Sequence, residues 1–451
     1  MAQLGERGIS DKSPGFVERT LYAAAVAVGL CIILFAVSPV PERGEAAVMA
    51  AAFGLLGGLL IFSFCGEVRP PAVLIFFAGA VAAGMVLRTV SLTQSNNTDY
   101  LSCLQPWARD FRELGWKAIV ETWSDYNMPY LYIIGLIARV PMNDLYLYKL
   151  VSVLFDCGLV LMALRLSSRF RLGSLRKMAL GAAVFLAPTV WLNSSFWGQC
   201  DSIYVFFCLS AFTFALEDKP GLSVAAAAVA FSFKLQTVFF LPIYLVLWIG
   251  KRVKLRQIPV FLAVFVGMYL PAWALGRPFA DIVRIYARQS SQYANRLNLN
   301  SPSAYALLNA SEPHDILFGA GLVMAFLFLG MLVLFAWLRR DRLSDRTLLL
   351  ITLAMVLGIP WFLPSMHDRY FYLADIFCLF VAVLIPEKWY FAPFCVLSSY
   401  AGYHAFLFGA YIPYFGLQIP SLIILFLTGS AVYMVSQALT GPAEGERRVA
   451  G

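Results

Sequence analysis

Charged side chains are scarce in this sequence. Only 13% of the 451 residues are Asp, Glu, Lys or Arg, whereas 60% are hydrophobic, and the mean hydropathy is +0.74. A soluble domain carries about 25% charged residues, so this chain has too little polar surface to fold in water. The short alternating segments of a transmembrane β-barrel are also missing, because the apolar runs are long and continuous. The composition predicts an all-α, polytopic membrane protein.

Motifs that bind metals or nucleotides are missing as well. The sequence has no HExxH, no DxD, no CxxC pair and no Cys/His cluster with zinc spacing, so we expect no metal and no cofactor. Cys103 and Cys200 could form a disulfide in an oxidising compartment, but two unpaired thiols are the simpler interpretation. The net charge of +8 resides in short loops between apolar runs, which is typical of topology signals and not of a nucleic-acid partner.

The apolar runs predict about fourteen spans, each near the roughly 20 residues that cross a bilayer. We expect them near 20–38, 47–65, 72–90, 146–165, 178–194, 201–216, 222–233, 237–250, 258–275, 316–338, 347–364, 371–385, 389–406 and 418–438. The short seventh and eighth spans meet at "SFKLQT", which indicates a re-entrant hairpin or two broken helices. Residues 20–440 would form one transmembrane domain between cytoplasmic tails, 1–19 and 441–451.

Basic loops give the orientation of these spans. "SSRFRLGSLRK", "GKRVKLRQ" and "LRRDRLSDR" are rich in Lys and Arg and are expected to be cytoplasmic. Two long loops, 91–145 and 276–315, then face outward together with "FWGQCD", "FKLQ" and "PSMHDRY". The sequence therefore predicts that its polar groups gather at one membrane face.

Three cationic or imidazole side chains are candidates for binding an anion at that face. Lys234 lies in an apolar stretch of more than twenty residues, where a charge costs at least about 2.5 kcal/mol. It either extends to the interface or holds an anion in a polar cavity, with Gln236 beside it. His367 and Arg369 precede a span and carry groups suited to phosphate oxygens.

The acidic and amide candidates lie in three outward segments. Asp99 follows the third span, and Asp125 with Tyr126 precedes Pro129, where Asp125 could equally cap a helix. Trp197, Gln199 and Asp201 stand together in "WGQCDSIY"; Asp201 could be a helix cap and Trp197 part of an interfacial aromatic belt. Asn300 lies in "LNLNSPSAY", a segment rich in groups that bond sugar hydroxyls.

The order "DY", "SDYNMPYLY", "WGQCDSIY", "FKLQ", "LNLNSPSAY" and "MHDRYFYLAD", from roughly 96 to 385, resembles bacterial GT-C glycosyltransferases. The nearest group is similar to integral membrane mannosyltransferases related to the second mannosyltransferase of GPI-anchor synthesis, and there is a more remote similarity to dolichol-phosphate-glucose enzymes. Two departures stand out. Two spans within 20–70 precede the expected start and would be an extension, and Ser303 replaces an Asn that relatives often carry.

This resemblance implies an inverting, metal-independent transfer of a mannose-like or glucose-like hexose from a polyprenyl-phosphate donor to a glycan, lipid or protein acceptor. The enzyme would lie in a bacterial inner membrane with its active site facing the periplasm. Asp99 would be the base, and Lys234, His367 and Arg369 would bind the donor phosphate. Sugar or acceptor contacts would come from Trp197, Gln199, Asp201, Asp125, Tyr126, Gln236 and Asn300. A transporter or flippase of an anionic sugar lipid is the alternative.

Overall fold

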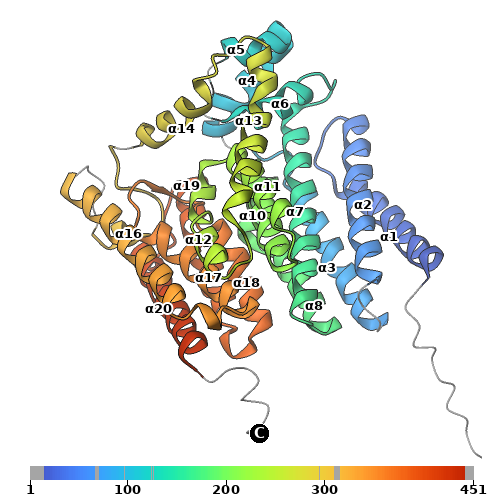
Figure 1. Cartoon of the computed structure of the whole chain (residues 1–451). Coiled ribbons are helices and arrows are strands. Elements are labelled where there is room, and N and C mark those ends of the chain that lie inside the picture. Colours follow the sequence, from blue (N-terminus) through green and yellow to red (C-terminus); the bar gives the residue numbers. More distant parts are fainter. Residues whose placement is uncertain are drawn as a thin grey trace, which may run out of the picture.

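A computed structural model describes residues 15–66, 71–95, 97–122, 124, 126–293, 295–308 and 315–441. Its elements are nearly all helices (Figure 1). The first half contains α1 (Phe16–Val37), α2 (Arg43–Cys65), α3 (Pro71–Val90), η1 (Asn97–Leu104), α4 (Gln105–Leu114), η2 (Gly115–Lys117), α5 (Ala118–Glu121), α6 (Met128–Ile137), α7 (Asp144–Arg169), α8 (Ser174–Leu186), α9 (Pro188–Trp191), η3 (Leu192–Trp197), α10 (Asp201–Leu216) and α11 (Pro220–Phe233).

The second half contains η4 (Leu235–Phe239), α12 (Ile243–Ile249), η5 (Leu255–Gln257), α13 (Ile258–Ala274), α14 (Asp281–Gln292), β1 (Asn298–Leu299), α15 (Ala304–Leu307), α16 (Asp315–Leu338), η6 (Arg340–Arg342), α17 (Asp345–Phe362), β2 (Met366–His367), α18 (Tyr372–Leu384), η7 (Pro386–Lys388), α19 (Phe391–Leu407) and α20 (Gln418–Thr440).

The expected all-α polytopic membrane fold is confirmed. In the described part of the chain, eight helices are long and apolar enough to cross a membrane, or up to nine if α8 and the bent segment after it form one span. Every one of the fourteen expected spans overlaps a helix, but α10, α11 and α18 are shorter than a full span. The number fourteen therefore stays a prediction, and so do the extension within 20–70 and the domain limits.

Two helical breaks carry polar residues into the bundle. The chain bends by 42° between α8 and Pro188–Trp197, since proline cannot donate the hydrogen bond that would continue the helix. It then passes through the π-helical turn η3 to Gly198, whose φ of 82° suits a residue without a side chain. The second break is at Lys234, which has extended backbone between α11 and the 3-10 turn η4, so the helix is interrupted within "SFKLQT".

A buried ion pair joins the early helices to the bundle. Arg88 of α3 donates to Asp156 of α7 at 2.8 Å and to the carbonyl of Phe185 at 3.1 Å, and both charged side chains are fully buried. Ser194 of η3 donates to the same Asp156 oxygen at 2.6 Å. Charged residues in a membrane bundle pair in this way because an unpaired charge there is costly.

The ends of the two broken helices lie at the same end of the bundle as the long connections. Figure 1 places α4, α5, α6 and α14 together at this end, above the spans. Here β1 pairs in parallel with β2, so that Leu299 lies opposite His367. The pairing fastens the segment before α15 to the loop between α17 and α18.

Candidate active site

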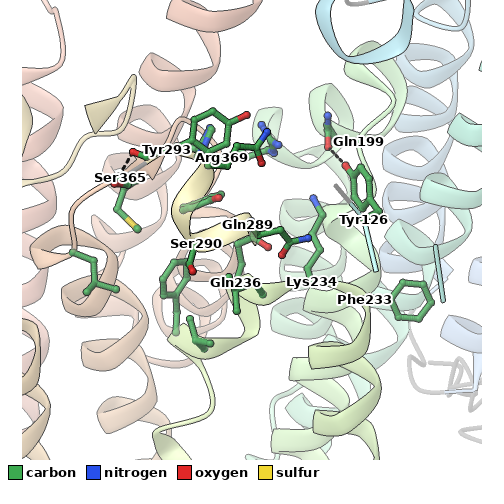
Figure 2. Close-up of a pocket in the computed structure, with 18 of the residues that line it drawn as sticks. Tyr126, Gln199, Phe233, Lys234, Gln236, Gln289, Ser290, Tyr293, Ser365 and Arg369 are labelled. Carbon is green, nitrogen blue, oxygen red and sulfur yellow. Dashed lines mark hydrogen bonds between the residues drawn. The ribbon is translucent and has the colours of Figure 1, made fainter. Parts of the chain in front are cut away.

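A cavity of about 550 Å³ opens among these segments. It is lined by η1, α4, the Gln199 turn, η4, α14, α16 and the loop before α18, and Figure 2 shows Tyr126, Gln199, Lys234 and Arg369 turned toward the same space. Polar lining comes from Asp99, Gln199, Lys234, Gln236, Gln289, Ser290, Gln292, His367 and Arg369. Apolar lining comes from Leu104, Phe233, Val238, Phe239, Phe318, Leu322 and Leu363. The cavity thus offers both a polar and an apolar surface.

Asp99 is held by the turn that follows η3. Its Oδ2 accepts hydrogen bonds from Trp197 Nε1 at 2.7 Å and from Gln199 Nε2 at 2.6 Å. The Gln199 Oε1 in turn accepts from the Tyr126 hydroxyl at 2.9 Å. Each donor in this series of hydrogen bonds faces an acceptor. This sets the orientation of the Gln199 amide and fixes one oxygen of the Asp99 carboxylate.

Trp197 lies beneath the cavity wall and not in its lining. Its side chain is 1% exposed, the Phe406 ring stacks on the indole at 4.7 Å, and the Arg369 guanidinium lies 5.0 Å from the ring centroid. The interfacial-belt interpretation of Trp197 is therefore wrong, because the indole is enclosed by protein. A sugar-stacking role would need these neighbours to move.

Asp201 is the counter-ion of the cationic residues. Its Oδ1 accepts from Lys234 Nζ at 2.5 Å, and its Oδ2 accepts from Asn193 Nδ2 at 2.7 Å and lies 3.5 Å from Arg369 Nε. The side chain is almost fully buried and makes no capping bond to α10, whose N-cap is Cys200. Lys234 is also buried and faces the Tyr126 ring at 5.4 Å, so it does not extend to the interface.

The pKa values of two neighbouring side chains in the loop between α17 and α18, His367 and Asp368, are shifted in opposite directions. Burial, reinforced by Arg369 and Lys234, lowers the pKa of His367 to about 3, so its imidazole is neutral at ordinary pH. Burial, reinforced by Asp99 and Asp201, raises the pKa of Asp368 to about 7 against the opposing effect of Arg369. The Nε2 of His367 is buried and has no hydrogen-bond partner among the described residues.

The remaining expected residues divide into two groups. Tyr126 and Gln236 line the cavity, whereas Asn300 does not, and its Oδ1 accepts a long 3.4 Å bond from the Tyr411 hydroxyl. Asp125 lies outside the described residues, so its proposed roles are untested. No disulfide joins Cys103 to Cys200, in agreement with the simpler interpretation. In the part of the chain that the structure describes, no three His, Cys, Asp or Glu side chains are grouped as a metal site.

Some residues of the site escaped sequence reasoning. Asn193 and Asp368 belong to the charged cluster, and Gln289 with Gln292 brings α14 into the lining. Lys149, fully buried in α7, contacts the segment that leads to Asp99. A signal for Lys149 exists in the sequence, since it is a cation inside an apolar run, as Lys234 is.

Comparison with known families identifies the class of protein to which the chain belongs. The model of glycosyltransferase family 87 matches residues 123–360, which is more than half of the chain. The chain belongs to glycosyltransferase family 87. It is therefore an integral membrane enzyme with a sugar donor and an acceptor, as expected from the GT-C resemblance, and the transporter alternative is not supported.

The matched range includes the Gln199 turn and Lys234 but ends before His367 and begins after Asp99. No curated protein matches the chain. The specific relation to the second GPI mannosyltransferase stays a prediction.

Proposed function

We propose that this family 87 enzyme transfers a hexose from a polyprenyl-phosphate donor, with inversion, at the cavity between η1, η4 and the loop before α18. One observation carries the proposal: a single cavity brings together a carboxylate, Asp99, two cations, Lys234 and Arg369, and an apolar wall. Such a combination suits a substrate with a sugar head, a phosphate and a hydrocarbon tail.

Asp99 is the proposed general base. The acceptor oxygen attacks the anomeric carbon, the bond from that carbon to the phosphate oxygen breaks, and the acceptor proton passes to Asp99. The bond electrons leave with the polyprenyl phosphate. Trp197 and Gln199 hold one oxygen of the carboxylate by bonds of 2.7 and 2.6 Å, which supports a fixed orientation toward the acceptor.

Lys234, Arg369 and His367 are the proposed partners of the phosphate leaving group. The two cations already share Asp201, so a phosphate entering the cavity would meet positive groups that their counter-ion keeps in place. The neutral His367 can donate one hydrogen bond without adding charge. Preorganised groups that stabilise a developing negative charge can lower the free energy of a transition state by several kcal/mol.

The apolar wall supports a lipid-linked donor. Phe318 and Leu322 of α16 line the cavity, while Phe326 and Leu327, further along the same helix, are exposed. A helix that lines the cavity and also exposes large apolar side chains offers a continuous surface for an acyl or prenyl chain. Periplasmic placement of this end follows from the basic loops at the other end and is part of the proposal.

The test is a transfer assay in nanodiscs. Radiolabelled polyprenyl-phosphate hexoses are offered with a lipid and glycan extract to the wild type, Asp99→Asn and Glu113→Gln. Asp99→Asn is expected to lower kcat by about 10²–10⁴-fold, the usual value of general-base catalysis, without loss of donor binding. Glu113, an exposed carboxylate of α4 paired only loosely with Arg109 at 4.0 Å, is the matched control and should keep its activity. Wild-type transfer that survives Asp99→Asn would remove Asp99 from the mechanism.

A further inference from the structure

Lys149 of α7 donates hydrogen bonds to the backbone segment that leads from α3 to Asp99. Its Nζ donates to the carbonyls of Ser91 and Leu92, each at 2.8 Å, and to the carbonyl of Gln94. An ammonium group has three donors, so all of them are used on three carbonyls of the turn that follows α3. The side chain is fully buried, and it forms no ion pair with a carboxylate among the residues that the structure describes. Its charge therefore acts on the backbone that precedes Asp99.

The same end of α7 also holds the chain on the other side of Asp99. Asp144, the first residue of α7, accepts from the Tyr100 hydroxyl at 2.6 Å. Tyr148 donates its hydroxyl to the carbonyl of Leu104 at 3.0 Å. The first two turns of α7 thus contact η1 and the turn before it at both ends of the segment that carries Asp99.

Lys149 lies between two segments: the one that leads to Asp99, and the turn around Gly198 whose side chains hydrogen-bond to Asp99. A Cβ placed on Gly198 would lie 3.8 Å from Lys149 Cε, so the lysine stem runs along the turn between Trp197 and Gln199. One helical turn further on, Ser152 donates to the carbonyl of Gln199 at 2.7 Å. Two residues on one side of α7 therefore contact Gly198 and Gln199, in the turn that carries both partners of the Asp99 hydrogen bonds.

We propose that Lys149 is a positioning residue that sets the distance between Asp99 and the Trp197–Gln199 turn. It bonds the turn carbonyls before Asp99 with its ammonium group and packs its stem against Gly198. This inference rests on the proposed role of Asp99 as the base. A reacting geometry displaced by about 1 Å can cost about 100-fold in rate, so a lysine that touches no substrate can control turnover.

The variants separate positioning from folding. Lys149→Met keeps the length of the side chain and removes the ammonium group, and Lys149→Arg restores a cation with several donors. Lys177→Met is the matched control, because Lys177 is also a buried lysine but bonds Ser168 at the other end of α7. Lys149→Gln, which keeps an N–H donor, replaces Lys149→Met if the latter does not yield a monodisperse protein.

Lys149→Met is expected to lower kcat by about 100-fold while the donor KM stays within about threefold, and Lys149→Arg should recover part of the loss. The decisive measurement is the double variant with Asp99→Asn. If Lys149 acts through Asp99, the double variant has the same residual rate as Asp99→Asn alone, because the position of an absent base no longer matters.

If the double variant loses kcat by the product of the two single-variant losses, the inference is overturned and Lys149 is a general stabiliser of the fold. A normal kcat in Lys149→Met, with Asp99→Asn inactive, would overturn the inference while the proposed function stands. Full activity of Asp99→Asn would instead contradict the proposed function itself, so the two failures are distinguishable.

Discussion

At the residue scale, the site consists of charged side chains that neutralise one another inside an apolar bundle. Asp201 lies within 3.5 Å of both Lys234 and Arg369, and Asp99 is fixed by two neutral donors. Such a cluster carries little net charge, and in the proposed function its two cations lie where the donor phosphate would enter. The ionisation of any further carboxylate there would therefore make the net charge of the cavity negative.

Asp368 is that further carboxylate. It lies 3.4 Å from Arg369 and interacts electrostatically with Asp99 and Asp201, and its pKa of about 7 is above the ordinary 3.8. Between about pH 4 and 7, the folded protein therefore retains a proton on Asp368 that the unfolded chain has already released. The contribution of Asp368 to stability is accordingly full at low pH and is lost as the pH rises through 7.

Asp368→Asn should abolish a pH dependence of donor binding. In the wild type, ionisation of Asp368 above about pH 7 adds a negative charge beside the cations proposed to bind the phosphate, so the donor KM should rise several-fold between pH 6 and 8. The asparagine cannot ionise, and its donor KM should stay at the low-pH value throughout. A donor phosphodiester does not titrate in this range, so an equal rise in both proteins would assign the effect to another group.

Sequence reasoning named Lys234 as a cation in an apolar run and Asp99, His367 and Arg369 as polar groups next to spans at the outward face, and all four line one cavity. The sequence was not sufficient to assign their partners. The bond from Trp197 to Asp99 spans 98 positions, and that from Lys149 to Ser91 spans 58. Partners so far apart along the chain become evident only when the helices are packed.

At the element scale, breaks in helices position the polar groups. The bend after α8 and the turn η3 expose Trp197 and Gln199 to Asp99, and the break after α11 turns Lys234 toward Asp201. The two short apolar runs that meet at "SFKLQT" predicted the second break. The apolar run over 178–194 predicted an unbroken span, although Pro188 lies within it and π-helical geometry follows.

The ion pair between Arg88 and Asp156 should stabilise the junction of α3, α7 and η3. Arg88→Met leaves a buried carboxylate without its cation, which should lower the free energy of unfolding by about 3–5 kcal/mol. The double variant Arg88→Met/Asp156→Leu removes both charges and should lose clearly less. Denaturant titration in mixed micelles measures both values. Equal losses in the single and double variants would show that packing, and not the unpaired charge, determines the effect.

At the scale of the whole molecule, the two ends of the bundle differ in their charged contacts. The cavity end holds a buried charged cluster as well as exposed pairs such as Arg109 with Glu113, whereas the pairs that join helices at the other end are exposed or half-buried. There Arg169 of α7 and Arg252 both bind Asp345 of α17, at 2.6 and 2.5 Å. The basic loops that predicted orientation from sequence thus also join neighbouring helices, a role that residue counts alone did not reveal.

The orientation of the molecule can be measured with introduced cysteines. Arg284 on α14 lies at the cavity end and is 73% exposed, and Asp341 lies beyond the opposite end of α16 and is 74% exposed. At a rise of about 1.5 Å per residue, a helix of the length of α16 spans a bilayer, so the two sites should lie on opposite sides. In right-side-out vesicles, a membrane-impermeant maleimide should label Arg284→Cys at once and Asp341→Cys only after permeabilisation. The parent chain, with its eight cysteines mostly buried, gives the background. The reverse pattern would place the cavity on the cytoplasmic side, where the donor would have to present its sugar before crossing the membrane.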